Sequence, residues 1–276
     1  MIEFTCNWRH RDGTPIVKDA AIEYYAERVL ADFQPQLLKE PGRIDELRFI
    51  EDYLGAAIFY PMIVGGSSEN YLAGATLFNG ARIMVYDEDD ERIVPVDFSP
   101  NTILINKPTL DNEGFSLFTH LHETGHYCMH RRVYQKSLYE QSLELFSDQI
   151  AAREGVFCRA NDMLHLDRRL ITQEDFREHQ ANVFAASLAM PRKMFRETVR
   201  EYVRKEGMGD GPDDVVVLHG WRAYGGYNYP LEKMLKTIAG IFGVSKTAVR
   251  VQMKSRGLLM SDREYEKKYG KIQVVV

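Results

Sequence analysis

Two histidines and a glutamate in the middle of the chain have the types and spacing of a metal site with its own base. His122, Glu123 and His126 form the pattern His-Glu-x-x-His. On a helix, residues i and i+4 lie one turn apart on one face, so the two imidazoles point at a common position and make half of a zinc site. Glu123 is rotated by about 100° from His122. It would lie beside an ion rather than on it, where a general base for a metal-bound water belongs.

The residues around this motif predict a helix with an apolar back and a polar front. The back carries Phe118, Leu121, Gly125, Cys128 and Met129, and the front carries Thr119, His122, His126 and His130. A helical glycine costs about 1 kcal/mol relative to alanine, so Gly125 predicts close packing against another element. We interpret Thr119 and His130 as pocket lining rather than as ligands.

A catalytic zinc site generally has three protein ligands and an open fourth position, and two glutamates downstream could supply the third. Glu178 is followed one helical turn later by Asn182, whose side chain could hydrogen-bond the far nitrogen of a ligand histidine. Glu144 has Asp148 in the same i+4 relation and lies closer to His126 in the sequence. Residue chemistry alone leaves both alternatives open.

The composition is that of an ordinary globular chain. With 276 residues, 45% hydrophobic and 27% charged, there is ample material for the core of one large domain or two small ones. A net charge of −5 gives no reason to expect general affinity for nucleic acid or anionic membranes. The three cysteines form no pattern, which favours a reducing compartment. Because no signal-like or membrane-spanning run is present, we expect a cytoplasmic protein without a membrane partner.

Periodicity and turn residues outline the elements that must position the motif. They predict helices over 18–33 and 44–54, then strands over 58–64, 82–86, 92–96 and 102–106. Thr172 is a candidate N-cap of the helix that carries Glu178. The glycine-rich segment 207–212 predicts a boundary between a domain over 1–206 and a module over 207–276. The expected fold class is α+β, with a small mixed sheet, two metal-bearing helices that face each other, and a helical C-terminal module.

The C-terminal module resembles a helix-turn-helix over 231–259, with Ser245 opening the second helix. Basic residues outnumber acidic ones from Ser245 onward, as direct DNA binding would require. The alternative is a helical pair that packs on the catalytic domain or docks a protein. We favour this alternative because the second helix offers few side chains that could read bases.

Two motifs together resemble the ImmA/IrrE family of zinc metallopeptidases over about residues 20–191. They are His122-Glu123-Thr124-Gly125-His126-Tyr127 with His130, and Glu178-x-x-Ala181-Asn182-x-Phe184-Ala185 with Leu188-x-Met190-Pro191. The resemblance implies a zincin-like fold, one zinc ion per chain, Glu178 as the third ligand, and Asn182 as partner of a ligand histidine. It also implies a regulatory protease whose protein substrate is a transcriptional repressor, often of helix-turn-helix type. The segment 131–171 departs from the family by its length, and it supplies the rival Glu144.

Two hypotheses from different classes result. In the first, the protein is an intracellular zinc endopeptidase in which Glu123 activates water for attack on a peptide carbonyl. In the second, it is a DNA- or protein-binding regulator whose metal site is structural or silent. Peptide cleavage that is lost on changing Glu123 alone would exclude the second hypothesis.

Overall fold

The motif helix α3 (Glu113–Met129) is central to the computed structural model, which describes residues 1–67, 70–134, 155–159, 170–209, 214–218 and 229–270. Asn112 caps the helix, because its side chain accepts a hydrogen bond from the backbone N–H of Phe115. From Leu117 to Tyr127 every residue except Phe118 is buried. The polar front is therefore covered by other parts of the chain, as a buried catalytic helix would require.

By its contacts, the chain divides into two compact units, which are residues 1–35 with 44–189, and residues 36–43 with 190–276. The predicted boundary at 206/207 lies inside the second unit, at the end of helix α8 (Arg192–Glu206). Helix α8 ends at Gly207, whose φ of +62° is the left-handed conformation that favours glycine at a helix end. The glycine-rich segment therefore marks the end of helix α8. The division between the two units lies earlier in the chain, before α8 begins.

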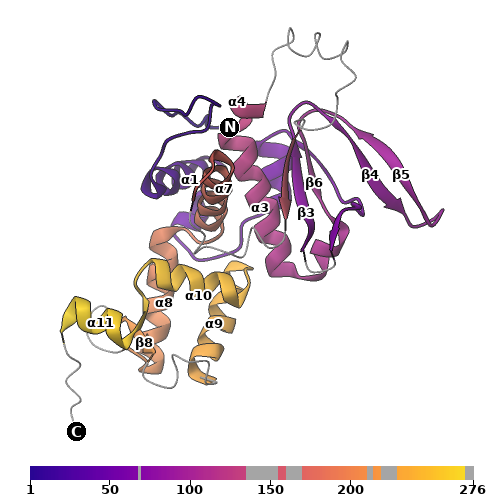
Figure 1. The fold of residues 1–276 in the computed structure, drawn as a ribbon. Helices are drawn as coiled ribbons and strands as arrows, with labels where there is room; N and C mark the ends of the chain where they lie inside the picture. The colour runs from indigo at the N-terminus through magenta and orange to yellow at the C-terminus, as the bar shows by residue number, and fades with distance from the viewer. Residues whose placement is uncertain (68–69, 135–154, 160–169, 210–213, 219–228, 271–276) are drawn as a thin grey trace. The chain divides into compact units, whose positions relative to one another are not determined.

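Figure 1 shows α3 between helices and a sheet in the first unit. Helix α7 (Gln173–Ala189) packs against α3, and helix α1 (Asp19–Phe33) packs against α7. Strands β3 (Asn70–Leu77) and β6 (Thr102–Ile105) pack against α3 as well. The predicted helix over 18–33 is confirmed by α1, whose buried face is formed by Ile22, Tyr25, Ala26, Val29 and Leu30.

The sheet behind α3 is mixed, as predicted. Its strand order is β1 (Ala57–Phe59), β6, β3 and β2 (Gly66–Ser67), and β7 (Gly155–Arg159) also pairs with β3. Strand β1 is parallel to β6, and β3 is antiparallel to β6, β2 and β7. The pairing of β3 with β7 shifts register between Leu72 and Gly74, which marks a β-bulge at Ala73. The structure confirms an α+β chain, and it adds strands β2, β3 and β7 to this sheet, none of which was predicted.

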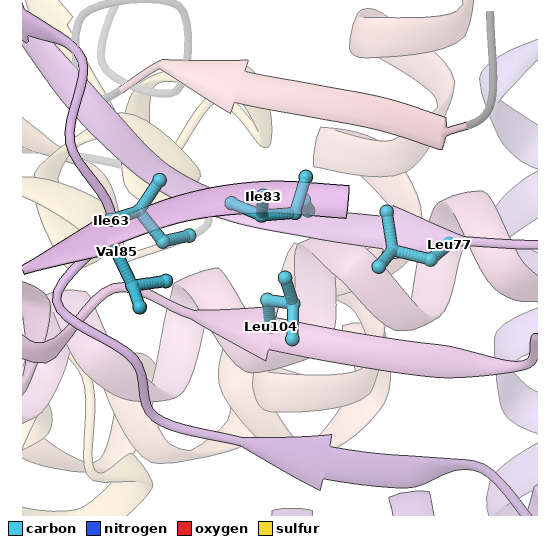
Figure 2. Packing of buried hydrophobic residues seen from close by; sticks show 6 residues of the cluster. Ile63, Leu77, Ile83, Val85 and Leu104 are labelled. Carbon is cyan, nitrogen blue, oxygen red and sulfur yellow. The ribbon is translucent and has the colours of Figure 1, made fainter. Parts of the chain in front are cut away.

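A hairpin of β4 (Ala81–Asp87) and β5 (Arg92–Phe98) packs on this sheet. Figure 2 shows the labelled side chains of the shared hydrophobic cluster; its buried members are Ile63, Ala75, Leu77, Ile83, Val85 and Leu104. The strands predicted over 82–86, 92–96 and 102–106 are confirmed. The predicted strand over 58–64 is reduced to β1 and an isolated bridge between Ile63 and Val85, because Pro61 interrupts it.

In the second unit, helices α9 (Tyr229–Phe242) and α10 (Lys246–Ser255) form the predicted helix, turn and helix. Ser245 caps α10 by accepting a hydrogen bond from the N–H of Ala248. Glu232 on α9 pairs with Lys246 at 2.8 Å and with Arg250 at 2.7 Å. Two basic side chains of the second helix are thus engaged within the unit.

The remaining described elements are short. Strands β8 (Val216–Leu218) and β9 (Leu259–Ser261) pair in parallel, and α11 (Asp262–Tyr269) follows. The predicted helix over 44–54 is α2 (Glu46–Arg48) continued by the π-helical turn η2 (Phe49–Tyr53). The others are η1 (Pro35–Leu38), η3 (Lys107–Asp111) and α4 (Arg131–Tyr134). Among the described helices, none is long and apolar enough to cross a membrane.

Candidate metal centre

Helices α3 and α7 approach each other most closely at Gly125. A Cβ atom added there would lie 2.9 Å from Ala181 Cα and 3.1 Å from the Ala181 carbonyl oxygen, so only glycine fits without a shift. The predicted close packing of Gly125 is therefore confirmed. Its partner, however, is the helix that carries Glu178, so Gly125, His122 and His126 all face α7, and Gly125 is not on the opposite side of α3 from the histidines.

The start of α7 is held by a reciprocal cap. Thr172 Oγ1 accepts a hydrogen bond from the N–H of Asp175 at 3.0 Å, and Asp175 Oδ2 accepts one from the N–H of Thr172 at 2.8 Å. This confirms Thr172 as the predicted N-cap. The cap fixes where the helix begins, and therefore the position of Glu178, six residues after Thr172 (178 − 172), on the helix that packs against α3.

The structure brings His122, His126 and Glu178 together as one group that could hold a metal ion. Glu178 Oε2 lies 3.2 Å from His122 Nε2, Glu178 Oε1 lies 3.3 Å from His126 Nε2, and the two Nε2 atoms are 2.9 Å apart. Ligand atoms at about 2.0–2.1 Å from a tetrahedral zinc ion are about 3.3 Å from one another, so this spacing fits. Both imidazoles are fully buried and the Glu178 side chain is 16% exposed. Two imidazole nitrogens and a carboxylate form a donor set that several divalent transition metals accept.

Asn182 determines which nitrogen of His122 can bind a metal. Asn182 Oδ1 lies 2.9 Å from His122 Nδ1 and can only accept a hydrogen bond. In the neutral ring Nδ1 therefore carries the proton and the lone pair is on Nε2, which faces Glu178. Only a ring protonated on both nitrogens can donate a hydrogen bond to that carboxylate. The orienting position that the resemblance gave to Asn182 is the position it has in the structure.

Glu123 is held by strand β3 on the side of α3 that faces the sheet. Thr76 Oγ1 donates a hydrogen bond of 2.6 Å to Glu123 Oε2. At Gly74, an added Cβ would lie 2.8 Å from Glu123 Oε1, so the absence of a side chain there makes room for the carboxylate. Glu123 Oε1 is buried and has no hydrogen-bond partner within the described part of the chain. Sequence reasoning missed both Gly74 and Thr76, because β3 was not predicted.

The two carboxylates of the site have opposite electrostatic environments. Burial raises the pKa of Glu123 to about 8, and the charge of His122 and the Thr76 hydrogen bond oppose this only in part. Burial also acts to raise the pKa of Glu178, but the charge of His126 and hydrogen bonds to both histidines outweigh it and hold that pKa well below its usual value. In metal-free protein Glu178 is therefore anionic, whereas Glu123 keeps its proton up to about neutral pH.

The other residues singled out from the sequence have different positions. Glu144 lies outside the described residues. The Thr119 hydroxyl donates to the carbonyl oxygen of Phe115 on the same helix, at 2.9 Å. His130, predicted to line the pocket, is hydrogen-bonded to His126, with 3.0 Å between His130 Nδ1 and His126 Nδ1.

The sequence matches no protein-family model and none of the curated proteins with which it was compared. The resemblance to zinc metallopeptidases therefore depends on the motif residues themselves.

Proposed function

We propose that the protein is a zinc-dependent endopeptidase with a zincin-like catalytic unit. His122, His126 and Glu178 hold the ion. The observation that carries the proposal is the buried Oε1 of Glu123, which has no hydrogen-bond partner among the described residues and belongs to the residue next to His122 in a group that could hold a metal. A hydrolase needs a proton acceptor there, and a purely structural metal site does not.

Each residue has a distinct part in the proposed reaction. A zinc ion bound there would lower the pKa of water and polarise a carbonyl oxygen. Glu123 takes a proton from the attacking water through Oε1 and passes it to the amine nitrogen of the leaving peptide. Thr76 holds the other oxygen, Oε2, and so fixes the direction in which the carboxylate points. Asn182 keeps His122 in the tautomer that binds metal.

The proposed substrate is a specific protein, such as a DNA-binding repressor of helix-turn-helix type. Support comes from the family resemblance, and a single cut between the DNA-binding and dimerisation parts would suffice to inactivate such a repressor. The helical second unit is the proposed determinant of substrate choice. Direct DNA binding by this unit is not favoured, since Lys246 and Arg250 are paired with Glu232.

The deciding experiment separates metal binding from hydrolysis. Glu123→Gln keeps the shape of the side chain and removes the base, so zinc content should equal that of the wild type while hydrolysis falls by about 10²–10⁴-fold. Glu113→Gln, an exposed substitution at the start of the same helix, is the matched control and should leave both unchanged. A Glu123→Gln protein that cleaves as fast as the control would show that Glu123 is not the base.

Because the substrate is unidentified, cleavage is best read from new peptide N-termini in an extract of the native host. Wild-type protein with zinc should create a small number of new termini that the Glu123→Gln protein does not create. Digestion of many unrelated proteins would contradict the narrow specificity. An absence of Glu123-dependent termini would favour the second hypothesis, a binding protein with a silent metal site.

A further inference from the structure

A chain of buried hydrogen bonds runs from His126 to the N-terminal segment of the protein. His126 Nδ1 lies 3.0 Å from His130 Nδ1, His130 Nε2 lies 3.0 Å from Gln180 Oε1, and Gln180 Nε2 donates to the Pro15 carbonyl oxygen at 2.8 Å. Both histidines are fully buried and Gln180 is 3% exposed. Solvent therefore does not compete for these bonds, and each donor must meet an acceptor within the chain.

The far end of the chain determines the direction of every bond in it. The Pro15 carbonyl oxygen can only accept, so the amide nitrogen of Gln180 must face it and Gln180 Oε1 must face His130. Gln180 Oε1 can only accept as well, so His130 carries its proton on Nε2. His130 Nδ1 is then a bare acceptor, and the proton between the two histidines belongs to His126 Nδ1. This leaves the lone pair of His126 on Nε2, the atom that faces Glu178.

We infer that His130 and Gln180 are positioning residues that keep His126 in its metal-binding tautomer. The inference rests on the proposed metal site, and it adds two residues for which the motif resemblance gave no such role. It also makes the two histidine ligands unequal. His122 is oriented by a single amide on α7, whereas His126 is oriented through two side chains that end on Pro15, 111 positions earlier in the chain (126 − 15).

The first test measures zinc affinity by competition with a chromophoric chelator, using the full-length protein. His130→Phe keeps a ring of similar size but leaves His126 Nδ1 without an acceptor, so zinc should bind about 10- to 100-fold more weakly. His130→Asn restores an acceptor oxygen near the position of Nδ1, so its affinity should lie closer to that of the wild type. Gln180→Met fills the space of Gln180 without fixing His130, so its loss should be smaller than that of His130→Phe.

His120→Phe is the matched control for the loss of a buried histidine. His120 lies on the same helix and hydrogen-bonds to the Ser116 carbonyl oxygen and to Tyr60. The His120→Phe protein should bind zinc with wild-type affinity. A folded His130→Phe protein with the zinc affinity of this control would overturn the inference, even if wild-type zinc binding and hydrolysis were both established.

The second test needs no variant. In zinc-loaded wild-type protein labelled with ¹⁵N-histidine, long-range ¹H–¹⁵N spectra report which ring nitrogens carry protons. The expected result is a proton on His130 Nε2 and none on His130 Nδ1. A proton on His130 Nδ1 would overturn the inference and leave the peptidase proposal intact. Failure of the wild-type protein to bind zinc would remove the basis of both.

Discussion

Replacement of Gly125 by alanine tests whether the contact between α3 and α7 sets the geometry of the metal site. The added Cβ would lie 2.9 Å from Ala181 Cα, whereas ordinary contacts are 3.4–4 Å, a shortfall of about 0.5 Å or more. The crowded atoms, Cα and the carbonyl oxygen, belong to the backbone of α7 and cannot rotate away. The helices must therefore separate, and Glu178 moves with α7, away from His122 and His126.

Two opposing effects decide the stability of this variant. Overpacking costs about 1–3 kcal/mol, whereas replacing a helical glycine by alanine gains about 1 kcal/mol. The free energy of unfolding of the metal-free protein should therefore fall by about 0–2 kcal/mol. Zinc affinity has no compensating gain, because metal–ligand distances tolerate deviations of only about 0.2 Å. We expect it to fall at least as far as on loss of an outer hydrogen-bond partner, which is about 10- to 100-fold.

The assay combines urea unfolding in the presence of a chelator with a zinc competition titration. Gly240, in the exposed part of α9, is the matched control, because a Cβ added there meets no described atom within 4 Å. Gly240→Ala should gain up to about 1 kcal/mol and leave zinc affinity unchanged. Adding Ala181→Gly to Gly125→Ala should not restore zinc binding, since the nearest crowded atoms are still present. If Gly125→Ala behaved like Gly240→Ala, the close contact would have no part in setting the site.

Three further predictions concern the carboxylates. Glu178→Ala should abolish stoichiometric zinc binding because only two imidazoles remain, whereas Glu144→Ala should retain it; metal analysis after dialysis decides between them. Thr76→Val removes a hydrogen bond to a charged group, worth about 1.5–3 kcal/mol, so hydrolysis should fall about 10- to 100-fold with zinc content unchanged. In metal-free protein the folded-state pKa of Glu123 is about 8 against an ordinary 4.5, so its stabilising contribution is present below about pH 4.5 and is lost as pH rises toward 8. Glu123→Gln lacks this loss. The free energy of unfolding of the variant minus that of the wild type should therefore be larger at pH 8 than at pH 5. Equal differences at both pH values would contradict the raised pKa of Glu123.

The two helices that carry His122, His126 and Glu178 were predictable because their sequence signals are local. His122 and His126 are one turn apart, and Thr172 starts the helix that brings Glu178 to them. Gly125 predicted a close contact because a glycine inside a helix lowers helix stability relative to alanine. The identity of the helix that touches Gly125 was not local information, and so its side of α3 was misjudged.

Strand β3 could not be predicted from the sequence, because its small residues, among them the Gly74 that makes room for the Glu123 side chain, are not typical of a strand. Alanine and glycine are unfavourable in strands, yet β3 contains Ala73, Gly74 and Ala75 in succession. Gly74 lacks a side chain where the Glu123 carboxylate lies, which is a requirement of tertiary contact that no local pattern reveals. The hydrogen-bond chain from His130 was hidden for a similar reason, since Gln180 and its own partner are 165 positions apart.

The bulge at Ala73 explains how one strand can both pack against α3 and hold the base. In a regular strand alternate residues share a face, so Ala73 and Gly74 would lie on opposite faces. The register shift there lets Ala73 pack with Phe115 and Phe118 of α3, while Gly74 is next to Glu123 on that same helix. The Glu123 carboxylate, the proposed base, is thus held by contacts with the sheet.

The proposed metal ligands are oriented from a different direction, by α7, through Asn182, Gln180 and the close contact at Gly125. The two supports share no side chain. Changes on α7 should therefore act on metal affinity, and changes on β3 should act on proton transfer. In hydrolysis assays at one zinc concentration, the loss of activity of a combined Thr76→Val and Gln180→Met protein, expressed as a free energy, should equal the sum of the losses of the two single variants. A strongly non-additive result would mean that α3 couples the two supports, and that the base moves when the ligands do.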